Sequence, residues 1–273
     1  MDISTMPRSY GATLPSWVFD ELNAVPNTLA TDEERMSLVH KLAARNPVEG
    51  SGGPFAALVV DSGTGEIVSA GVNLVLASGL SAAHAEIVAL SLAQTRVGGW
   101  DLGAAGAPDR ELVVNWRPCA QCYGATLWSG VERLVVAGEG PELEQLTGFD
   151  EGPMRADWAE QFRSRGIEVV SDVLREQALE VFAAYSRMAA DHGLTVYNAR
   201  GTARGSLRAV PIRGRTVPAT TSLPAGGARG MSVPLANFRD VLISRKKRGY
   251  ANDHRGHYLS RTVRRRRFGT QVL

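Results

Sequence analysis

The chain has 273 residues, 44% of them hydrophobic, which is enough for a substantial core in one large domain or in one domain with appendages. It contains no run of about 18 apolar residues, and its first residues lack the basic and apolar regions of a secretory signal. These features suggest neither a membrane span nor export, so we expect a cytoplasmic protein.

The net charge of +2 conceals two regions of opposite character. Residues 205–273 carry 15 Lys and Arg against two acidic residues, whereas the rest of the chain is acidic overall. This basic stretch is also rich in Pro and Gly, a composition that predicts disorder. We therefore divide the chain into an irregular lead-in (1–27), a folded domain (28–204) and a basic tail of low structure (205–273).

The first half of the folded domain predicts a helix, a β-hairpin and a second helix. A capping box opens the helix predicted over 31–45. The apolar segments 55–61 and 66–73 flank a Ser-Gly-Thr-Gly turn and predict two antiparallel strands. A second helix is predicted over 81–95, with Ser81 as its N-cap.

The second half alternates strands with helices. Strands are predicted over 111–115, 133–137 and 167–170, and helices over 118–130, 154–165 and from Asp172 onward. Strands that alternate with helices after an initial hairpin predict an α/β fold of three α/β/α layers around a five-stranded mixed sheet.

The only two cysteines lie in the segment Pro118-Cys119-Ala-Gln-Cys122, and His84-Ala-Glu86 precedes them. One imidazole and two thiolates supply three of the four ligands of a tetrahedral Zn²⁺ ion and leave the fourth position for water. Glu86 is placed to move protons beside the metal without binding it, a combination typical of zinc deaminases of nucleobases. A redox pair of cysteines is the alternative for this spacing, and a purely structural zinc site would need a further protein ligand.

The positions of these motifs on helices also favour a common metal. His84 and Glu86 fall in the first turn of one predicted helix, and Cys119 and Cys122 share one face of the next. Two helix N-termini then converge on the ion. Their partial positive charge favours thiolate over thiol.

Residues 28–203 resemble bacterial guanine deaminases, within the cytidine-deaminase-like zinc deaminases. The resemblance is carried by GGPFAA at 52–57, Asn73, SAAHAEIVALSLAQ at 81–94, PCAQCYGATLWSGV at 118–131, GFDEGP at 148–153 and VYNAR at 196–200. It implies action on guanine, giving xanthine and ammonia, and also on the aminotriazine ammeline. The chain departs from many relatives at Arg117, where they carry Glu, and this leaves the charge next to the metal open.

The resemblance implies further site residues. Asn73 would read the base, although a turn role is the alternative, and Phe55 would stack on the base unless it belongs to the core. Ala85 would also contact the substrate. Glu151 would be a second catalytic acid that accepts hydrogen bonds from the base, with Asp150 as its fallback and a solvated turn as the alternative for both.

The sequence leaves open the roles of three large aromatic side chains and of the segment after the last helix. Trp100, Trp116 and Tyr197 are typical core side chains, with cavity walls as the alternative. The segment 196–200 is a candidate lid. The resemblance also implies a homodimer.

Other functions remain open from the sequence. The same fold includes deaminases of transfer-RNA adenosine, cytosine and cytidine. A basic tail attracts polyanions, so contact of residues 205–273 with nucleic acid is possible in charge terms, although an unstructured extension is the favoured interpretation. A third hypothesis is a non-catalytic, zinc-stabilised nucleic-acid-binding module, against which the presence of Glu86 argues.

Overall fold

The computed structural model describes residues 6–194 and 196–198. The chain divides into two units, residues 1–212 and 213–273, and every element below belongs to the first. The predictions for the basic tail lie outside the described residues, and the proposed boundary at 204/205 stays a prediction.

The core of the fold is a five-stranded sheet with the order β2-β1-β3-β4-β5. Its strands are β1 (Ala56–Asp61), β2 (Ile67–Val72), β3 (Arg110–Val114), β4 (Arg133–Val136) and β5 (Glu168–Val170). Strand β1 pairs antiparallel with β2 and β3, while β3, β4 and β5 run parallel. The predicted mixed sheet and the predicted hairpin are both confirmed.

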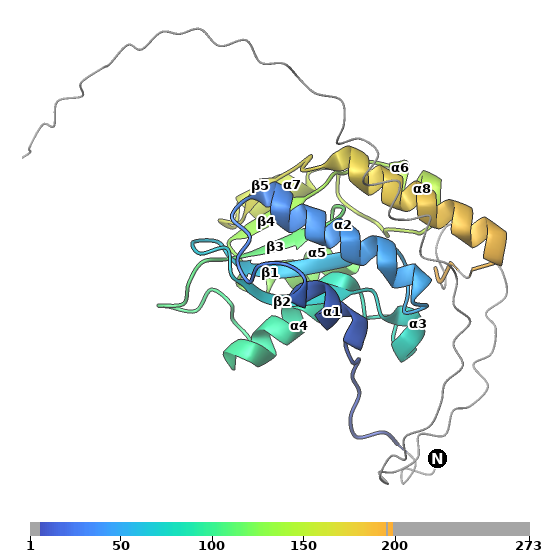
Figure 1. Ribbon diagram of the computed structural model, residues 1–273. Coiled ribbons are helices and arrows are strands. Elements are labelled where there is room, and N and C mark those ends of the chain that lie inside the picture. Colours follow the sequence, from blue (N-terminus) through green and yellow to red (C-terminus); the bar gives the residue numbers. More distant parts are fainter. Residues whose placement is uncertain (1–5, 195, 199–273) are drawn as a thin grey trace, which may run out of the picture. The chain divides into compact units, whose positions relative to one another are not determined.

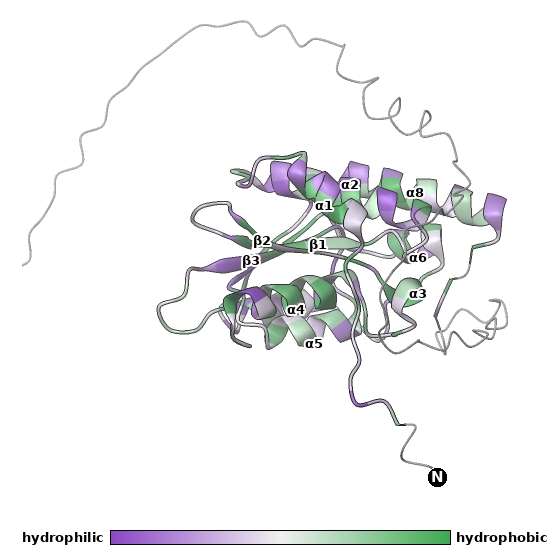
Figure 2. Cartoon of the chain, turned by 60° about the horizontal axis from the view of Figure 1, so that its bottom comes forward, coloured by the Kyte–Doolittle hydropathy of each residue, from purple (hydrophilic) through white to green (hydrophobic). Residues whose placement is uncertain are grey.

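Helices cover both faces of this sheet (Figure 1). They are α1 (Ser16–Asn23), α2 (Asp32–Val48), α3 (Val75–Ser78), α4 (Ala85–Val97), α5 (Ala120–Leu127), α6 (Glu142–Thr147), α7 (Trp158–Arg163) and α8 (Arg175–His192). Figure 2 shows α2 and α8 on one side of the sheet and α4 and α5 on the other. The three-layer α/β/α architecture predicted from the alternation of elements is confirmed.

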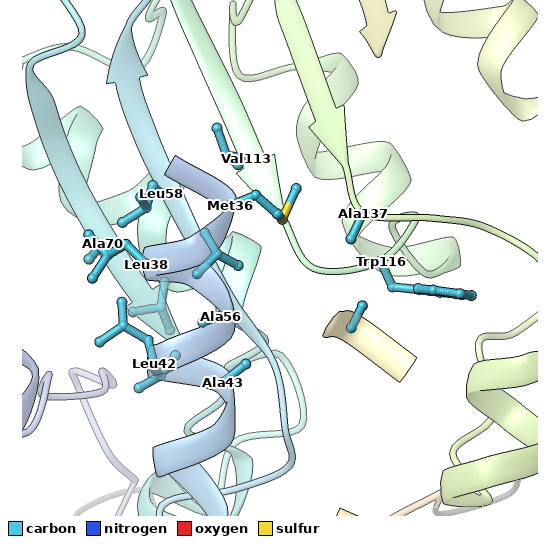
Figure 3. Close-up of a cluster of buried hydrophobic side chains, with 14 of the residues drawn as sticks. Met36, Leu38, Leu42, Ala43, Ala56, Leu58, Ala70, Val113, Trp116 and Ala137 are labelled. Carbon is cyan, nitrogen blue, oxygen red and sulfur yellow. The ribbon is translucent and has the colours of Figure 1, made fainter. Parts of the chain in front are cut away.

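Alternating side chains of β1 divide the core in two. Leu58 packs in the cluster under α2 and α8, and Val59 packs in the cluster under α4 and α7. Figure 3 shows the first cluster, in which Met36 and Leu42 of α2 meet the apolar sheet face. Since β1 is buried on both faces, its sequence is a continuous apolar run, as expected of an interior strand.

Helix α2 begins as the sequence predicts. The Thr31 hydroxyl accepts a hydrogen bond from the Glu34 backbone N–H at 3.2 Å, and the Glu34 carboxylate accepts one from the Thr31 N–H at 3.2 Å. This reciprocal pair satisfies two backbone donors at the helix start. The capping box is therefore confirmed, although the helix continues to Val48 rather than ending near Arg45.

The lead-in at residues 1–27 differs from its prediction as irregular chain, because it contains helix α1. The helix has no side-chain cap, and its stability comes from tertiary packing. Trp17 and Val18 are buried in the core, and the Arg45 guanidinium lies 5.1 Å from the centre of the Trp17 ring. A contact between segments so far apart in sequence is invisible to a local pattern.

Other boundaries also differ from the prediction. Helices α3 and α6 were not expected, and α7 is shorter than the predicted 154–165. Helix α8 begins at Arg175 because Asp172 and Leu174 adopt positive φ angles of 64° and 55°, which no helix can contain. None of the helices in the described part of the chain is long and apolar enough to cross a membrane.

A buried ion network joins α2 to the sheet. Glu111, fully buried on β3, contacts the guanidinium of Arg35 at 2.6 Å and that of Arg133 at 2.5 Å. Asp32 binds Arg133 at 2.6 Å. Each charge in this network depends on the others, because an unpaired charge at this depth would be strongly destabilising.

We expect Glu111→Ala to lower the free energy of unfolding by about 3–5 kcal/mol, since it leaves the buried Arg35 with only the more distant Asp32 carboxylate, at 3.4 Å. The matched control is Glu66→Ala, which removes the exposed pair with Arg96 and should cost less than about 1 kcal/mol. Urea unfolding of the zinc-saturated variants measures both values. Equal losses in the two variants would show that the network contributes nothing beyond a surface pair.

Candidate metal centre and cavity

The two sequence motifs meet at the starts of two helices. His84 is the N-cap of α4 and Cys119 is the N-cap of α5, and both have extended backbone angles. The predicted starts at Ser81 and Pro118 are therefore wrong by a few residues, because the chain stays extended up to each ligand. The predicted convergence of two helix N-termini on one point is confirmed, since the side chains of these two N-caps meet.

His84, Cys119 and Cys122 are placed to hold one metal ion. Their ligand atoms all lie within 4.8 Å of one another, and the His84 Nδ1 atom lies 3.4 Å from the Cys119 Sγ and 3.6 Å from the Cys122 Sγ. A tetrahedral Zn²⁺ with ordinary bond lengths requires about 3.6 Å between such a nitrogen and sulfur. No fourth His, Cys, Asp or Glu of the described residues joins this group, so a tetrahedral ion held by these three side chains would have one position left for water.

Both cysteines are free thiols, and their electrostatics suit metal binding. The hydrogen bond from Cys122, together with the neighbouring His84, lowers the pKa of Cys119 to about 4, in spite of burial. Burial and the adjacent Cys119 raise the pKa of Cys122. A bound cation would overcome the raised pKa of Cys122, because a thiol that coordinates a metal ion is deprotonated outright.

Two carboxyl groups lie beside this centre, both nearly buried. Glu86, in the first turn of α4, is 7% exposed, and Glu151 is 8% exposed. Burial, with the nearby Cys119 as the next cause, raises the pKa of each. Two buried acids next to a metal site are typical of a centre that transfers protons rather than of a structural zinc site.

A cavity of about 200 Å³ opens onto these groups. It is smaller than the roughly 300–1,000 Å³ of pockets for drug-sized ligands, so it suits a single small ring system. Its lining contains His84, Cys119, Glu86, Glu151, Asp150, Asn73, Phe55, Trp116, Arg117, Phe149, Tyr197, Asn198, Ser81 and Val114.

Most of the predicted substrate contacts line this cavity, but Ala85 does not. The Ala85 side chain is fully buried in the core under α4, beside Ala57 and Ala89. Trp116 forms part of the cavity wall, whereas Trp100 is 77% exposed and lies outside it.

Asn73 is held in one orientation. Its Oδ1 atom accepts hydrogen bonds from the Tyr197 hydroxyl at 2.7 Å and from the Val75 backbone N–H at 3.2 Å. The Tyr197 oxygen also accepts a hydrogen bond from the Gly53 N–H at 3.0 Å. Since its oxygen is engaged on two sides, the Asn73 amide presents its NH₂ group as the donor for a ligand.

The segment 196–198 fastens the turn that carries the second acid. Asn198 accepts a hydrogen bond from the Asp150 N–H at 3.0 Å and donates one to the Gly148 carbonyl at 2.7 Å. The Glu151 carbonyl accepts a hydrogen bond from the Ala120 N–H at 2.9 Å, so Glu151 is also attached to the start of α5. This segment thus lines the cavity of the chain to which it belongs.

Sequence reasoning missed one wall of the cavity. The Phe149 ring packs edge-on against Phe55 at 5.3 Å and lies 4.9 Å from Tyr197. The signal was its place inside the GFDEGP motif, next to the predicted acids. Phe55 also packs against Phe182 in the core, so its two proposed roles do not exclude each other.

The three-layer fold and a His, Cys, Cys centre beside buried acids define a zinc-dependent hydrolytic deaminase. The chain belongs to the family with the cytidine and deoxycytidylate deaminase zinc-binding region, whose pattern matches residues 29–138.

Among solved structures, a guanine deaminase from Nitrosomonas europaea is 40% identical, with a TM-score of 0.63 over 67% of this chain and 98% of that one. The crystal structure of a mutant protein in complex with 8-azaguanine has the same identity and TM-score, and the match covers 67% of this chain and 99% of that one. These similarities agree with the resemblance inferred from the motifs.

Two curated proteins of Bacillus subtilis are also similar. Its guanine deaminase is 33% identical over 110 residues, which cover 40% of this chain and 65% of that protein. The chain therefore spans slightly less than two thirds of this relative. The tRNA-specific adenosine deaminase is 30% identical over 159 residues, which cover 58% of this chain and 91% of that protein.

Proposed function

We propose that this deaminase acts on a free nucleobase, guanine, and converts it with water to xanthine and ammonia. The observation that carries the proposal is the position of Glu151, a second buried acid in the same small cavity as Glu86 and His84. Guanine presents N–H donors along one edge, which a carboxyl group accepts well. The similar structures with bound 8-azaguanine and 2,6-diaminopurine support a ligand of purine size.

His84, Cys119 and Cys122 would hold the zinc ion. When bound, zinc lowers the pKa of a coordinated water toward about 7 and so supplies a nucleophile at neutral pH. Glu86 would take one proton from that water and deliver it to the ring nitrogen beside C2. It would then take the proton of the hydroxyl group newly bonded to C2 and pass it to the amino group, which leaves as ammonia while C2 becomes a carbonyl carbon. Proton transfer requires that Glu86 be held in place, which its burial at the start of α4 provides.

The remaining cavity groups would orient the base. Asn73 would donate its NH₂ to a ring acceptor, and Glu151 would accept a ring N–H, with Asp150 as the alternative acid. Phe55 and Phe149 supply aromatic surface for the ring faces. Ammeline has a comparable amino-bearing ring carbon and is a second candidate substrate.

A deaminase of transfer-RNA adenosine is the second candidate function. Its support is the similarity to the tRNA-specific adenosine deaminase over 91% of that protein, together with the basic composition of residues 205–273. We also propose that the protein is a homodimer, as the resemblance implies, and analytical ultracentrifugation checks its mass in solution.

Ammonia release from a panel of substrates separates these functions. The zinc-loaded protein should release ammonia from guanine, and from ammeline if the cavity accepts triazines, but not from adenine, cytosine or cytidine. Truncation at residue 204 should leave guanine turnover within about twofold of the full chain, because the basic tail attracts only polyanions. Turnover of transfer RNA without turnover of guanine would instead establish the second candidate.

A further inference from the structure

Arg117 lies two residues before Cys119, at the entrance to helix α5. Its backbone N–H donates a hydrogen bond to the Gly138 carbonyl at 2.9 Å, which ties this loop to the chain after β4. The side chain is half-buried and lines the cavity together with Asn73 and Glu151. The fold therefore places a guanidinium group at the proposed binding site.

The Nη1 atom of Arg117 is buried and has no hydrogen-bond partner among the described residues. Arg117 takes part in none of the ion pairs found there, whereas Arg35, Arg133 and Arg175 all contact carboxylates. A buried donor without an acceptor destabilises the folded state. Because the Arg117 side chain as a whole is half-buried in the cavity wall, a small rotation would bring Nη1 to an acceptor on a ligand and remove this cost.

The neighbouring acid defines what kind of ligand fits. Burial is the largest effect on Glu151 and raises its pKa, whereas the positive charge of Arg117 lowers it. The guanidinium is therefore close enough to Glu151 for both groups to face the same ligand. A carboxyl group keeps an acceptor oxygen whether or not it is protonated. The cavity thus offers a donor and an acceptor together, which match the carbonyl oxygen and the adjacent ring N–H of a lactam.

Guanine and adenine present different hydrogen-bonding groups at this edge of the ring. Guanine has a carbonyl oxygen next to a ring N–H, whereas adenine has an amino group next to a ring acceptor. Arginine pairs with the oxygen of guanine in the commonest specific contact to that base in nucleic acids.

We propose that Arg117 is a specificity-determining residue that donates a hydrogen bond to the carbonyl oxygen of a lactam-containing base. The inference rests on the proposed deamination of guanine and adds which edge of the base is read, and by which residue. A different role, as a mere counter-charge to Glu151, would help every ligand to the same degree.

Titration calorimetry with two ligands tests this inference. 8-Azaguanine keeps the carbonyl oxygen, whereas 2,6-diaminopurine has an amino group in its place. Arg117→Ala in the zinc-loaded full chain that also carries Glu86→Gln, so that the ligands are not deaminated during the titration, should weaken binding of 8-azaguanine by about 10- to 100-fold and binding of 2,6-diaminopurine by less than about twofold. Arg165→Ala, at an exposed arginine outside the cavity, should change neither affinity.

Equal weakening of the two ligands, or no weakening of either, would overturn the inference. Zinc content and melting temperature check that Arg117→Ala is folded, and Arg117→Gln is the replacement if it is not. The proposed function fails separately: in that case the wild-type chain releases no ammonia from guanine and binds neither purine. Guanine turnover with no preference set by Arg117 refutes the inference alone.

Discussion

Glu86→Gln should lower guanine turnover by about 10²- to 10⁴-fold while the zinc content stays at one ion per chain. This is the range that general acid–base catalysis contributes, and Gln keeps the size and hydrogen bonding of Glu but carries no transferable proton. Zinc is retained because the His84, Cys119 and Cys122 side chains are unchanged.

The loss of activity in Glu86→Gln should not be accompanied by a loss of stability. Glu86 is buried, and burial raises the pKa of its carboxyl group, so an ionised carboxylate at this place is costly to the folded state. Gln removes that cost, and we expect a melting temperature equal to or above that of the wild type. Glu132→Gln, at an exposed glutamate, should change neither property. Wild-type turnover in Glu86→Gln would remove Glu86 from the proton transfer.

Removal of zinc should abolish turnover completely and also destabilise the protein. A chelator leaves Glu86 and Glu151 in the cavity but no activated water, and the return of Zn²⁺ should restore activity. A ligand present at about 1,000 times its dissociation constant stabilises the folded state by about 4 kcal/mol, so the melting temperature should fall on chelation.

Cys122→Ala tests the same site without a chelator. Loss of one of three protein ligands should reduce zinc affinity by more than about 100-fold, since even changes next to the ligands cost 10- to 100-fold. Chelated wild type and untreated Cys122→Ala should then have similarly low activity. The chelator should also lower the melting temperature of Glu86→Gln, which keeps the site. Full activity in metal-free protein would exclude a catalytic zinc ion.

The sequence predicts most of the features that depend on neighbouring residues. The capping box at Thr31, the hairpin around Gly63 and the apolar strands follow from short patterns, and the structure contains them. The metal ligands were also predictable, because the chain has only two cysteines and both stand in one motif. Their convergence followed from placing both motifs at helix starts.

The features that the sequence did not predict depend on contacts between distant segments. Helix α1 is held by Trp17 against α2, and its own sequence contains no cap. The orientation of Asn73 comes from Tyr197, 124 positions away along the chain. Likewise, the exact starts of α4 and α5 are set where His84 and Cys119 meet, which no local propensity encodes.

X-ray absorption spectroscopy of the purified zinc protein is the most direct test of the central claim. We expect one zinc ion per chain with two sulfur ligands at about 2.3 Å and two nitrogen or oxygen ligands at about 2.0–2.1 Å, one from His84 and one from solvent. Four ligands from the protein, or a zinc ion without sulfur, would contradict a centre built from His84, Cys119 and Cys122 with a position open to water.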